Sequence, residues 1–224
     1  MTISQASVPA PTRFSLMHQV PKLCYITDRK QFGSFAGFSE FLMKAARANI
    51  DLVQIREKDL DTRTLLELTS AAMQAARDCA ARIVLNDRMD VAIAAGAAGI
   101  HLGNQSLPAS VVRRIAPSGF LVGVSCHSME DAANAEAAGA DYVLLGPIFE
   151  TPSKLAYGPP LGLPLLEAVA HRAKLPVLAL GGITLRRIQT CVMAGAVGIA
   201  GIRIFQECAS IESRIGELRA ELEK

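Results

Sequence analysis

An alternation of short apolar runs with longer helical patterns, repeated about eight times from Lys22 onward, constrains this fold most. Each run is apolar along most of its length, which is typical of parallel strands buried on both faces. Helical patterns such as Leu65–Ala81 and Met129–Ala138 lie between the runs, and Ser128 is a predicted N-cap. The predicted strands are Leu23–Thr27, Leu52–Arg56, Ile83–Asn86, Gly99–His101, Leu121–Ser125, Tyr142–Leu145, Val177–Leu180 and Gly198–Gly201.

This alternation predicts a parallel α/β fold. A doubly wound open sheet would also satisfy it, but such sheets more often have about five or six strands. Eight units therefore favour a single (β/α)8 TIM barrel with parallel strands. No shift in composition marks a second domain, so we expect a loose N-terminal arm over residues 1–21 and the barrel over residues 22–224.

Composition excludes several classes of protein. The 23 basic and 21 acidic residues give a net charge of +2, too balanced for bulk electrostatic binding of nucleic acid or membrane. No apolar stretch approaches the roughly 20 residues of a membrane span, and no signal peptide is evident. The sequence predicts a soluble, cytoplasmic protein with reduced thiols, because no C-x-x-C pair occurs among Cys24, Cys79, Cys126, Cys191 and Cys208.

Polar residues follow the predicted strands, and a barrel would gather them at one mouth. Arg56 and Lys58 alternate on an extended segment, so both face the same way and suit a diphosphate. Asp87 offers a hard oxygen ligand for Mg²⁺. Gly181-Gly182 precedes a helical pattern, where bare backbone N–H groups can hold a phosphate. The mouth is therefore predicted to bind two phosphorylated groups.

Each of these features also has a plainer structural interpretation. Arg56 and Lys58 taken alone indicate a solvated charge pair, and Asn86-Asp87 alone indicates a helix N-cap. The two glycines alone indicate a turn. His101 and His127 are, taken singly, typical of hydrogen-bonded structural histidines. The joint placement of polar residues at nearly every strand end favours a binding site.

Several segments, in this order, resemble the thiamine phosphate synthase and TenI family from about Leu23 to Phe205. The resemblance implies a TIM barrel and an enzyme that joins hydroxymethylpyrimidine diphosphate to thiazole phosphate, releasing pyrophosphate. The segments that carry it are Tyr25-Ile26-Thr27-Asp28, Val53 to Lys58, Leu85-Asn86-Asp87-Arg88, Gly99 to Gly103, Gly123-Val124-Ser125, Ala140-Asp141-Tyr142, Gly146 to Lys154 and Ala179 to Ile183.

The resemblance also implies roles for individual residues. Asp87 would hold Mg²⁺. The pyrimidine diphosphate would be held by Gln54, Arg56, Lys58, Asn86, Ser125 and Lys154. The thiazole phosphate would face Thr151, Ser153, Gly182, Ile202 and Arg203. Arg56, Lys58 and Lys154 would stabilise the departing diphosphate in a pocket kept from water.

Three positions depart from the family pattern. Ser106 stands where the family usually has a second Mg²⁺-binding Asp, and a hydroxyl is a weaker, neutral ligand. The Ala-Asp-Gly common before His101 reads Ala97-Ala98-Gly99. Arg203 replaces the Ser of the last phosphate loop, so it would grip a phosphate directly.

Two alternative functions remain open from the sequence. TenI-like relatives aromatise a thiazole phosphate tautomer, and His127 matches the position of their proposed base. Retention of Gln54, Arg56, Lys58 and Lys154 favours the synthase over this tautomerase. The third alternative is a non-catalytic sensor of thiamine precursors. The expected partners are small-molecule substrates, without nucleic acid or membrane, and a homo-oligomer is compatible with the sequence.

Overall fold

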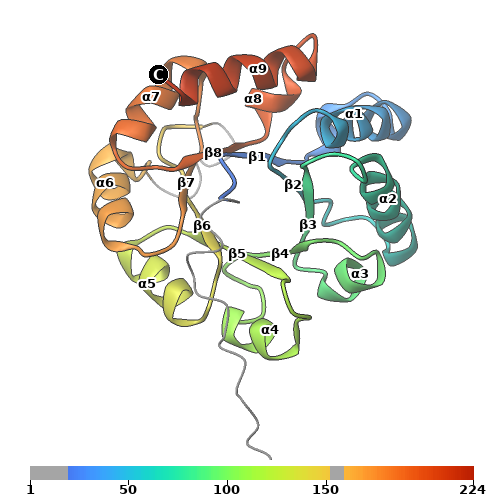
Figure 1. Ribbon diagram of the computed structural model, residues 1–224, viewed down its shortest axis with the longest axis horizontal. Coiled ribbons are helices and arrows are strands. Elements are labelled where there is room, and N and C mark those ends of the chain that lie inside the picture. The colour runs from blue at the N-terminus through green and yellow to red at the C-terminus, as the bar shows by residue number, and fades with distance from the viewer. Residues whose placement is uncertain (1–19, 152–158) are drawn as a thin grey trace, which may run out of the picture.

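The computed structural model describes residues 20–151 and 159–224. Within them, parallel strands pair in chain order and close into one barrel, with β8 beside β1 (Figure 1). This confirms the TIM barrel and excludes the doubly wound sheet. The strands are β1 (Leu23–Ile26), β2 (Leu52–Ile55), β3 (Arg82–Asn86), β4 (Gly99–Leu102), β5 (Leu121–Cys126), β6 (Tyr142–Leu145), β7 (Val177–Leu180) and β8 (Gly198–Gly201).

Helices surround the barrel on its outer face (Figure 1). They are the 3₁₀ helix η2 (Arg29–Gln31), then α1 (Phe35–Arg47), α2 (Thr62–Ala75), α3 (Met89–Ala94), α4 (Ala109–Ile115), α5 (Met129–Ala137), α6 (Gly162–Arg172), α7 (Leu185–Met193), α8 (Arg203–Gln206) and α9 (Ile211–Leu222). None of the described helices has the length and apolar character needed to cross a membrane. Of the predicted N-terminal arm, residues 1–19 lie outside the described residues, and the 1–21 boundary stays a prediction.

Local capping sets the helix boundaries. Ser128 caps α5 as predicted, because its hydroxyl accepts the Asp131 N–H at 3.0 Å. The prediction of a helix over Leu65–Ala81 is wrong at both ends. The Asp61 carboxylate accepts the Thr64 N–H at 3.1 Å, so α2 begins at Thr62. The helix ends at Ala75, because the chain must turn before it enters β3 at Arg82.

The inside of the barrel is packed with side chains, as in other barrels of this size. Its lower layers are largely aliphatic and include Leu52, Val84, Leu144 and Leu178. Tyr142 is the large exception, and it is buried across the interior with only 1% of its surface exposed.

Gly123 in β5 makes room for the Tyr142 ring. A Cβ at position 123 would lie 2.1 Å from Tyr142 Cζ and 2.6 Å from His101 Nδ1. His101 is itself buried between Tyr142, whose hydroxyl lies 3.3 Å from Nδ1, and Ser125, whose hydroxyl lies 2.9 Å from Nε2. Burial lowers the pKa of His101 to about 3 from an ordinary value of 6.5, so the ring is neutral. A neutral histidine therefore links the packed interior to the polar rim.

Gly123→Ala should lower the free energy of unfolding by roughly 1–3 kcal/mol or more, because the added methyl group overpacks the interior. Urea denaturation would measure the change. Gly216→Ala is a matched control, since nothing lies within 4 Å of a Cβ built there on α9. The control should stabilise the protein by about 0.5–1 kcal/mol. Equal stability of the two variants would contradict the packing argument.

The buried His101 should also make stability depend on pH. Between about pH 6.5 and about pH 3 the unfolded chain binds a proton at this residue that the folded chain does not bind. The free energy of unfolding should therefore fall as pH decreases through this window. His101→Gln, whose amide cannot titrate there, should show a shallower decline in denaturation curves at several pH values. His171→Gln, on the exposed surface of α6, is the control and should decline as steeply as the unmodified chain.

Candidate functional site at the carboxyl rim of the barrel

The closed parallel topology brings the carboxyl ends of all eight strands to one rim. The predicted site residues within the described chain lie on or just after these strand ends, from Gln54 in β2 to Arg203 after β8. Ser153 and Lys154 lie outside the described residues.

Arg56 and Lys58 follow β2 and are both exposed, whereas Glu57 between them is buried. The expected alternation is therefore present, with both cations on the same side. Within residues 20–151 and 159–224, no carboxylate lies within ion-pair distance of either cation. Two neighbouring cations without an acidic partner are suited to an anion with more than one negative charge.

Glu57 is a buried anchor that the sequence interpretation missed. Its carboxylate accepts the Thr27 hydroxyl at 2.5 Å and the Arg29 N–H at 3.2 Å, while Thr27 Oγ1 accepts the Arg56 N–H at 2.9 Å. Burial raises the pKa of Glu57, and these hydrogen bonds oppose the rise. The backbone between the two cations is thus tied to β1. The sequence did contain a signal for this role. Glu57 stands between Arg56 and Lys58 on an extended segment, so its side chain must point to the opposite side from theirs.

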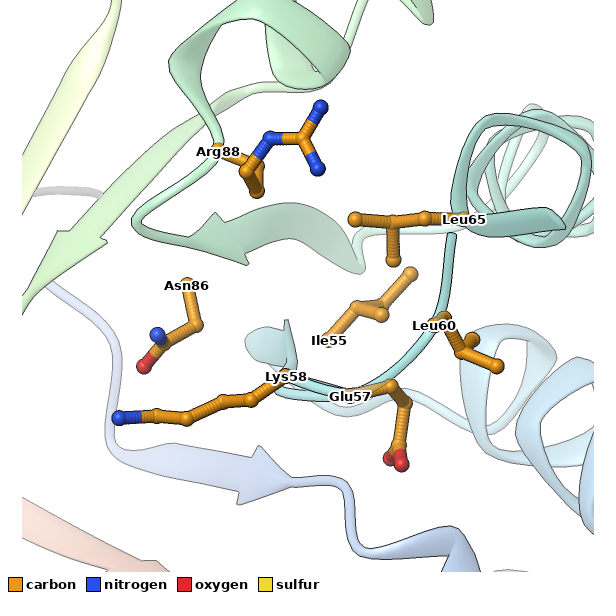
Figure 2. Close-up of a pocket in the computed structure, with 7 residues that line it drawn as sticks. All are labelled: Ile55, Glu57, Lys58, Leu60, Leu65, Asn86 and Arg88. Atoms are coloured by element: carbon orange, nitrogen blue, oxygen red, sulfur yellow. The ribbon is translucent and has the colours of Figure 1, made fainter. Parts of the chain in front are cut away.

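A small pocket lies between the ends of β2 and β3 (Figure 2). The Lys58 and Asn86 side chains extend to one side of it, and Arg88 and Glu57 point in other directions (Figure 2). Gln54 is 2% exposed and donates to Asn86 Oδ1 at 3.1 Å. Gln54 Oε1 is buried with no partner among the described residues, so it is an acceptor open to a donor on a bound molecule.

Asp87 does not cap the helix that follows it. Arg88 is the N-cap of α3 and makes no side-chain cap hydrogen bond. Asp87 instead has a left-handed backbone, with φ of 62°, and its exposed carboxylate receives hydrogen bonds from Asn86 Nδ2 at 2.6 Å and from the Ser106 hydroxyl. A non-glycine residue in this conformation is uncommon outside Asn and Asp, and such strain gathers at functional sites.

This arrangement leaves few ligands for a metal. No cluster of three or more His, Cys, Asp or Glu side chains suited to a metal ion occurs in the described part of the chain. Asp87 and Ser106 nevertheless place a carboxylate and a hydroxyl oxygen side by side at the rim. Mg²⁺ commonly takes only one or two protein carboxylates when substrate phosphates and water complete its shell. The donor set therefore fits a magnesium ion shared with a diphosphate.

Two histidines flank β5. His101 holds the Ser125 hydroxyl, as described above. His127 Nδ1 lies 2.5 Å from the Gly146 carbonyl oxygen, and its backbone N–H donates to Asp131 at 2.8 Å. Because a carbonyl oxygen only accepts, the Nδ1 nitrogen that faces it carries a proton.

The turn after β7 contains Gly181 and Gly182 at φ of +93° and +66°. A Cβ at Gly182 would lie 2.6 Å from the Glu150 carbonyl oxygen, so only glycine fits there. Thr184, the N-cap of α7, makes no side-chain cap hydrogen bond. The N–H groups of Gly182 and Ile183 have no acceptor among the described residues. Free amides before a helix form an anion-binding turn.

The remaining predicted residues follow β6 and β8, the strands on either side of β7. Thr151 follows β6 and is 9% exposed. Ile202 follows β8 and is half-buried. Arg203 is the first residue of α8, and its only described ion pair is a long one, with Nε 3.9 Å from Glu207 Oε1. An exposed pair of this kind is weak, so the guanidinium can turn toward the mouth.

Known proteins share this architecture. The chain is 41% identical over 177 residues to a thiamine-phosphate synthase from Roseiflexus sp., covering 79% of this chain and 75% of that protein. It is 39% identical over 204 residues to one from Methanoculleus marisnigri, covering 88% and 97%. A relative from Geobacter sulfurreducens is 46% identical over 178 residues, covering 80% and 83%.

Solved structures are similar to this chain as well. Thiamine phosphate pyrophosphorylase from Pyrococcus furiosus aligns with a TM-score of 0.80 and 32% identity over 90% of this chain and 95% of that chain. A 3-hexulose-6-phosphate synthase, at 21% identity and a TM-score of 0.64, shares the fold alone. The family model described as thiamine monophosphate synthase matches residues 23–205, which include every described site residue. The chain therefore belongs to the thiamine monophosphate synthase family.

Proposed function

We propose that this protein is a thiamine phosphate synthase, a transferase that couples hydroxymethylpyrimidine diphosphate with thiazole phosphate to give thiamine phosphate and pyrophosphate. One observation carries the proposal: two groups of anion donors, each without a described protein partner, share a single rim. Arg56 and Lys58, which have no ion-pair partner among the described residues, would form one site after β2. The Gly182 and Ile183 amides, which have no acceptor among those residues, would form the other after β7. The names of the relatives from Roseiflexus and Methanoculleus support the same activity.

In the proposed reaction the C–O bond between the pyrimidine methylene and the diphosphate breaks, and its electron pair leaves with the diphosphate. The methylene becomes cationic. The thiazole nitrogen then donates its lone pair to form the C–N bond, which leaves the positive charge on the thiazolium ring. Arg56, Lys58 and Lys154 would stabilise the departing diphosphate, since preorganised charges act most strongly where charge develops.

The remaining residues would orient the two substrates. The unpartnered Gln54 Oε1 would accept a hydrogen bond from the pyrimidine, with Asn86 holding the amide in place. Ser125, set by neutral His101, would bind beside it. Gly182, Thr151, Ser153, Ile202 and Arg203 would hold the thiazole phosphate, so that its nitrogen faces the methylene.

Mg²⁺ would be held by Asp87 and Ser106 together with diphosphate oxygens. It would neutralise charge on the leaving group when bound. The hydroxyl of Ser106 replaces the carboxylate usual in the family, so this chain should hold the ion less tightly. Both Asp87 oxygens already accept hydrogen bonds, which keeps the carboxylate in one orientation.

The tautomerase alternative is not favoured by the comparisons. The curated relatives carry synthase names, and the cations after β2 have no role in a proton transfer on the thiazole alone. His127 follows β5 at the rim and is proposed here as a polar group beside the thiazole. A cytoplasmic location and a homo-oligomer also remain proposals; the free thiols of all five cysteines are consistent with a reducing compartment.

The purified protein should form thiamine phosphate and release pyrophosphate when given both phosphorylated substrates and Mg²⁺. Arg56→Ala should lower kcat at least about a hundredfold, because one stabiliser of the leaving group is lost. Arg172→Ala removes the same charge from the carboxyl end of α6, at the opposite end of the barrel, and should leave the rate unchanged. Conversion of the thiazole tautomer without any coupling product would instead establish the isomerase.

The magnesium proposal is tested at position 106. Ser106→Asp should tighten apparent Mg²⁺ affinity about tenfold, because a carboxylate adds a charged oxygen ligand. Asp87→Ala should abolish detectable binding. Isothermal titration of Mg²⁺ in the presence of pyrophosphate measures both effects without turnover. Unchanged heats for both variants would place the metal elsewhere.

A further inference from the structure

Two carbonyl groups in the glycine turn after β7 are held by hydrogen bonds from neighbouring segments. The Gly181 carbonyl accepts the Phe149 N–H at 3.1 Å. The Gly182 carbonyl accepts a hydrogen bond from Nη1 of Arg187, in the first turn of α7, at 2.7 Å. In Figure 1, α7 lies outside the barrel beside β7 and β8.

A planar trans peptide points its C=O and the following N–H in opposite directions. Fixing the Gly181 carbonyl therefore fixes the Gly182 N–H, and fixing the Gly182 carbonyl fixes the Ile183 N–H. Both amides lack an acceptor among the described residues. The Gly181 carbonyl is held by a backbone hydrogen bond alone, whereas the Gly182 carbonyl depends on the Arg187 side chain.

Arg187 is itself held in place. Its Cζ lies 4.5 Å from the centroid of the Phe149 ring, a cation–π contact. Phe149 belongs to the segment after β6, and its Cβ would lie 2.7 Å from a Cβ at Gly182. The guanidinium thus joins α7, the glycine turn and the β6 loop at one point. Its charge is engaged with a carbonyl and a ring behind the turn.

We propose that Arg187 is a positioning residue that aims the Ile183 N–H, and with it the phosphate-binding turn, at the phosphate of the thiazole substrate. The proposal rests on the proposed function insofar as that function names this phosphate. Arg187 acts through the peptide between residues 182 and 183 and does not touch the substrate.

Arg187→Ala should raise KM for thiazole phosphate about tenfold, the factor expected when one hydrogen bond to a charged group is misdirected. The kcat and the KM for the pyrimidine diphosphate should stay within about twofold, because the β2 site is untouched. Arg186→Ala is the matched control: it removes the neighbouring exposed charge on α7 and should behave like the unmodified chain.

Two further variants separate geometry from charge. Arg187→Gln keeps a donor for the Gly182 carbonyl without a charge and should recover part of the affinity. Arg187→Lys keeps the charge but lacks the planar group that stacks on Phe149. If Arg187→Lys kept the full affinity for thiazole phosphate and Arg187→Gln recovered none of it, the effect would come from charge and the proposal would be overturned. This pair also decides the question if the Ala variant does not fold.

Titration of the ¹⁵N-labelled chain with inorganic phosphate gives a readout that needs no turnover. The Ile183 amide signal should shift, and Arg187→Ala should require about tenfold more phosphate for half the shift. If no thiamine phosphate forms but this dependence holds, the proposed function fails and the positioning role stands. Equal titrations of the Arg187→Ala and Arg186→Ala variants, or no phosphate-dependent shift in the unmodified chain, would overturn the positioning role.

Discussion

Pairing of the first strand with the last makes every other feature of the site possible. Leu23 in β1 lies opposite Ile199 in β8, and this contact closes the ladder. At the other end of the barrel, Asp51 accepts the N–H groups of Lys22 and Leu23 and forms an ion pair with Arg219 of α9. Closure leaves no unpaired sheet edge and gives the barrel a single carboxyl rim. Groups from distant parts of the chain then share one mouth.

Hydrogen bonds among residues behind the rim orient the polar groups of the rim itself. Glu57 and Thr27 hold the backbone of Arg56, and neutral His101 holds the Ser125 hydroxyl. The β6 segment and α7 hold the carbonyls of the glycine turn. Such fixed dipoles and charges need no reorganisation when charge develops on a substrate.

Beside Asp87 the rim carries the Ser106 hydroxyl, where the family resemblance implies a second acidic residue. Ser106 is neutral, so it adds no negative charge beside Asp87. The local field is then more positive, which favours a diphosphate but weakens retention of a cation. In the proposed reaction, neutralisation of the leaving group would therefore rest largely on the cationic side chains.

The sequence alone determined the barrel, because uniformly apolar strands repeated eight times have few other arrangements. It also determined the order of the polar groups at the strand ends, since these follow the strands directly along the chain. The strand boundaries agree with the prediction to within a residue or two, whereas α2 differs because Asp61 and the turn before β3 decide where it begins and ends.

Only the tertiary structure decided which polar groups are buried, neutral or free. The charge of His101 depends on Tyr142 and Ser125, which pack around it from other strands. The anchoring role of Glu57 depends on Thr27, thirty residues away, and that of Arg187 depends on Phe149. Whether a polar group is hydrogen-bonded or desolvated depends on its neighbours in space, and local sequence patterns do not show which residues those neighbours are.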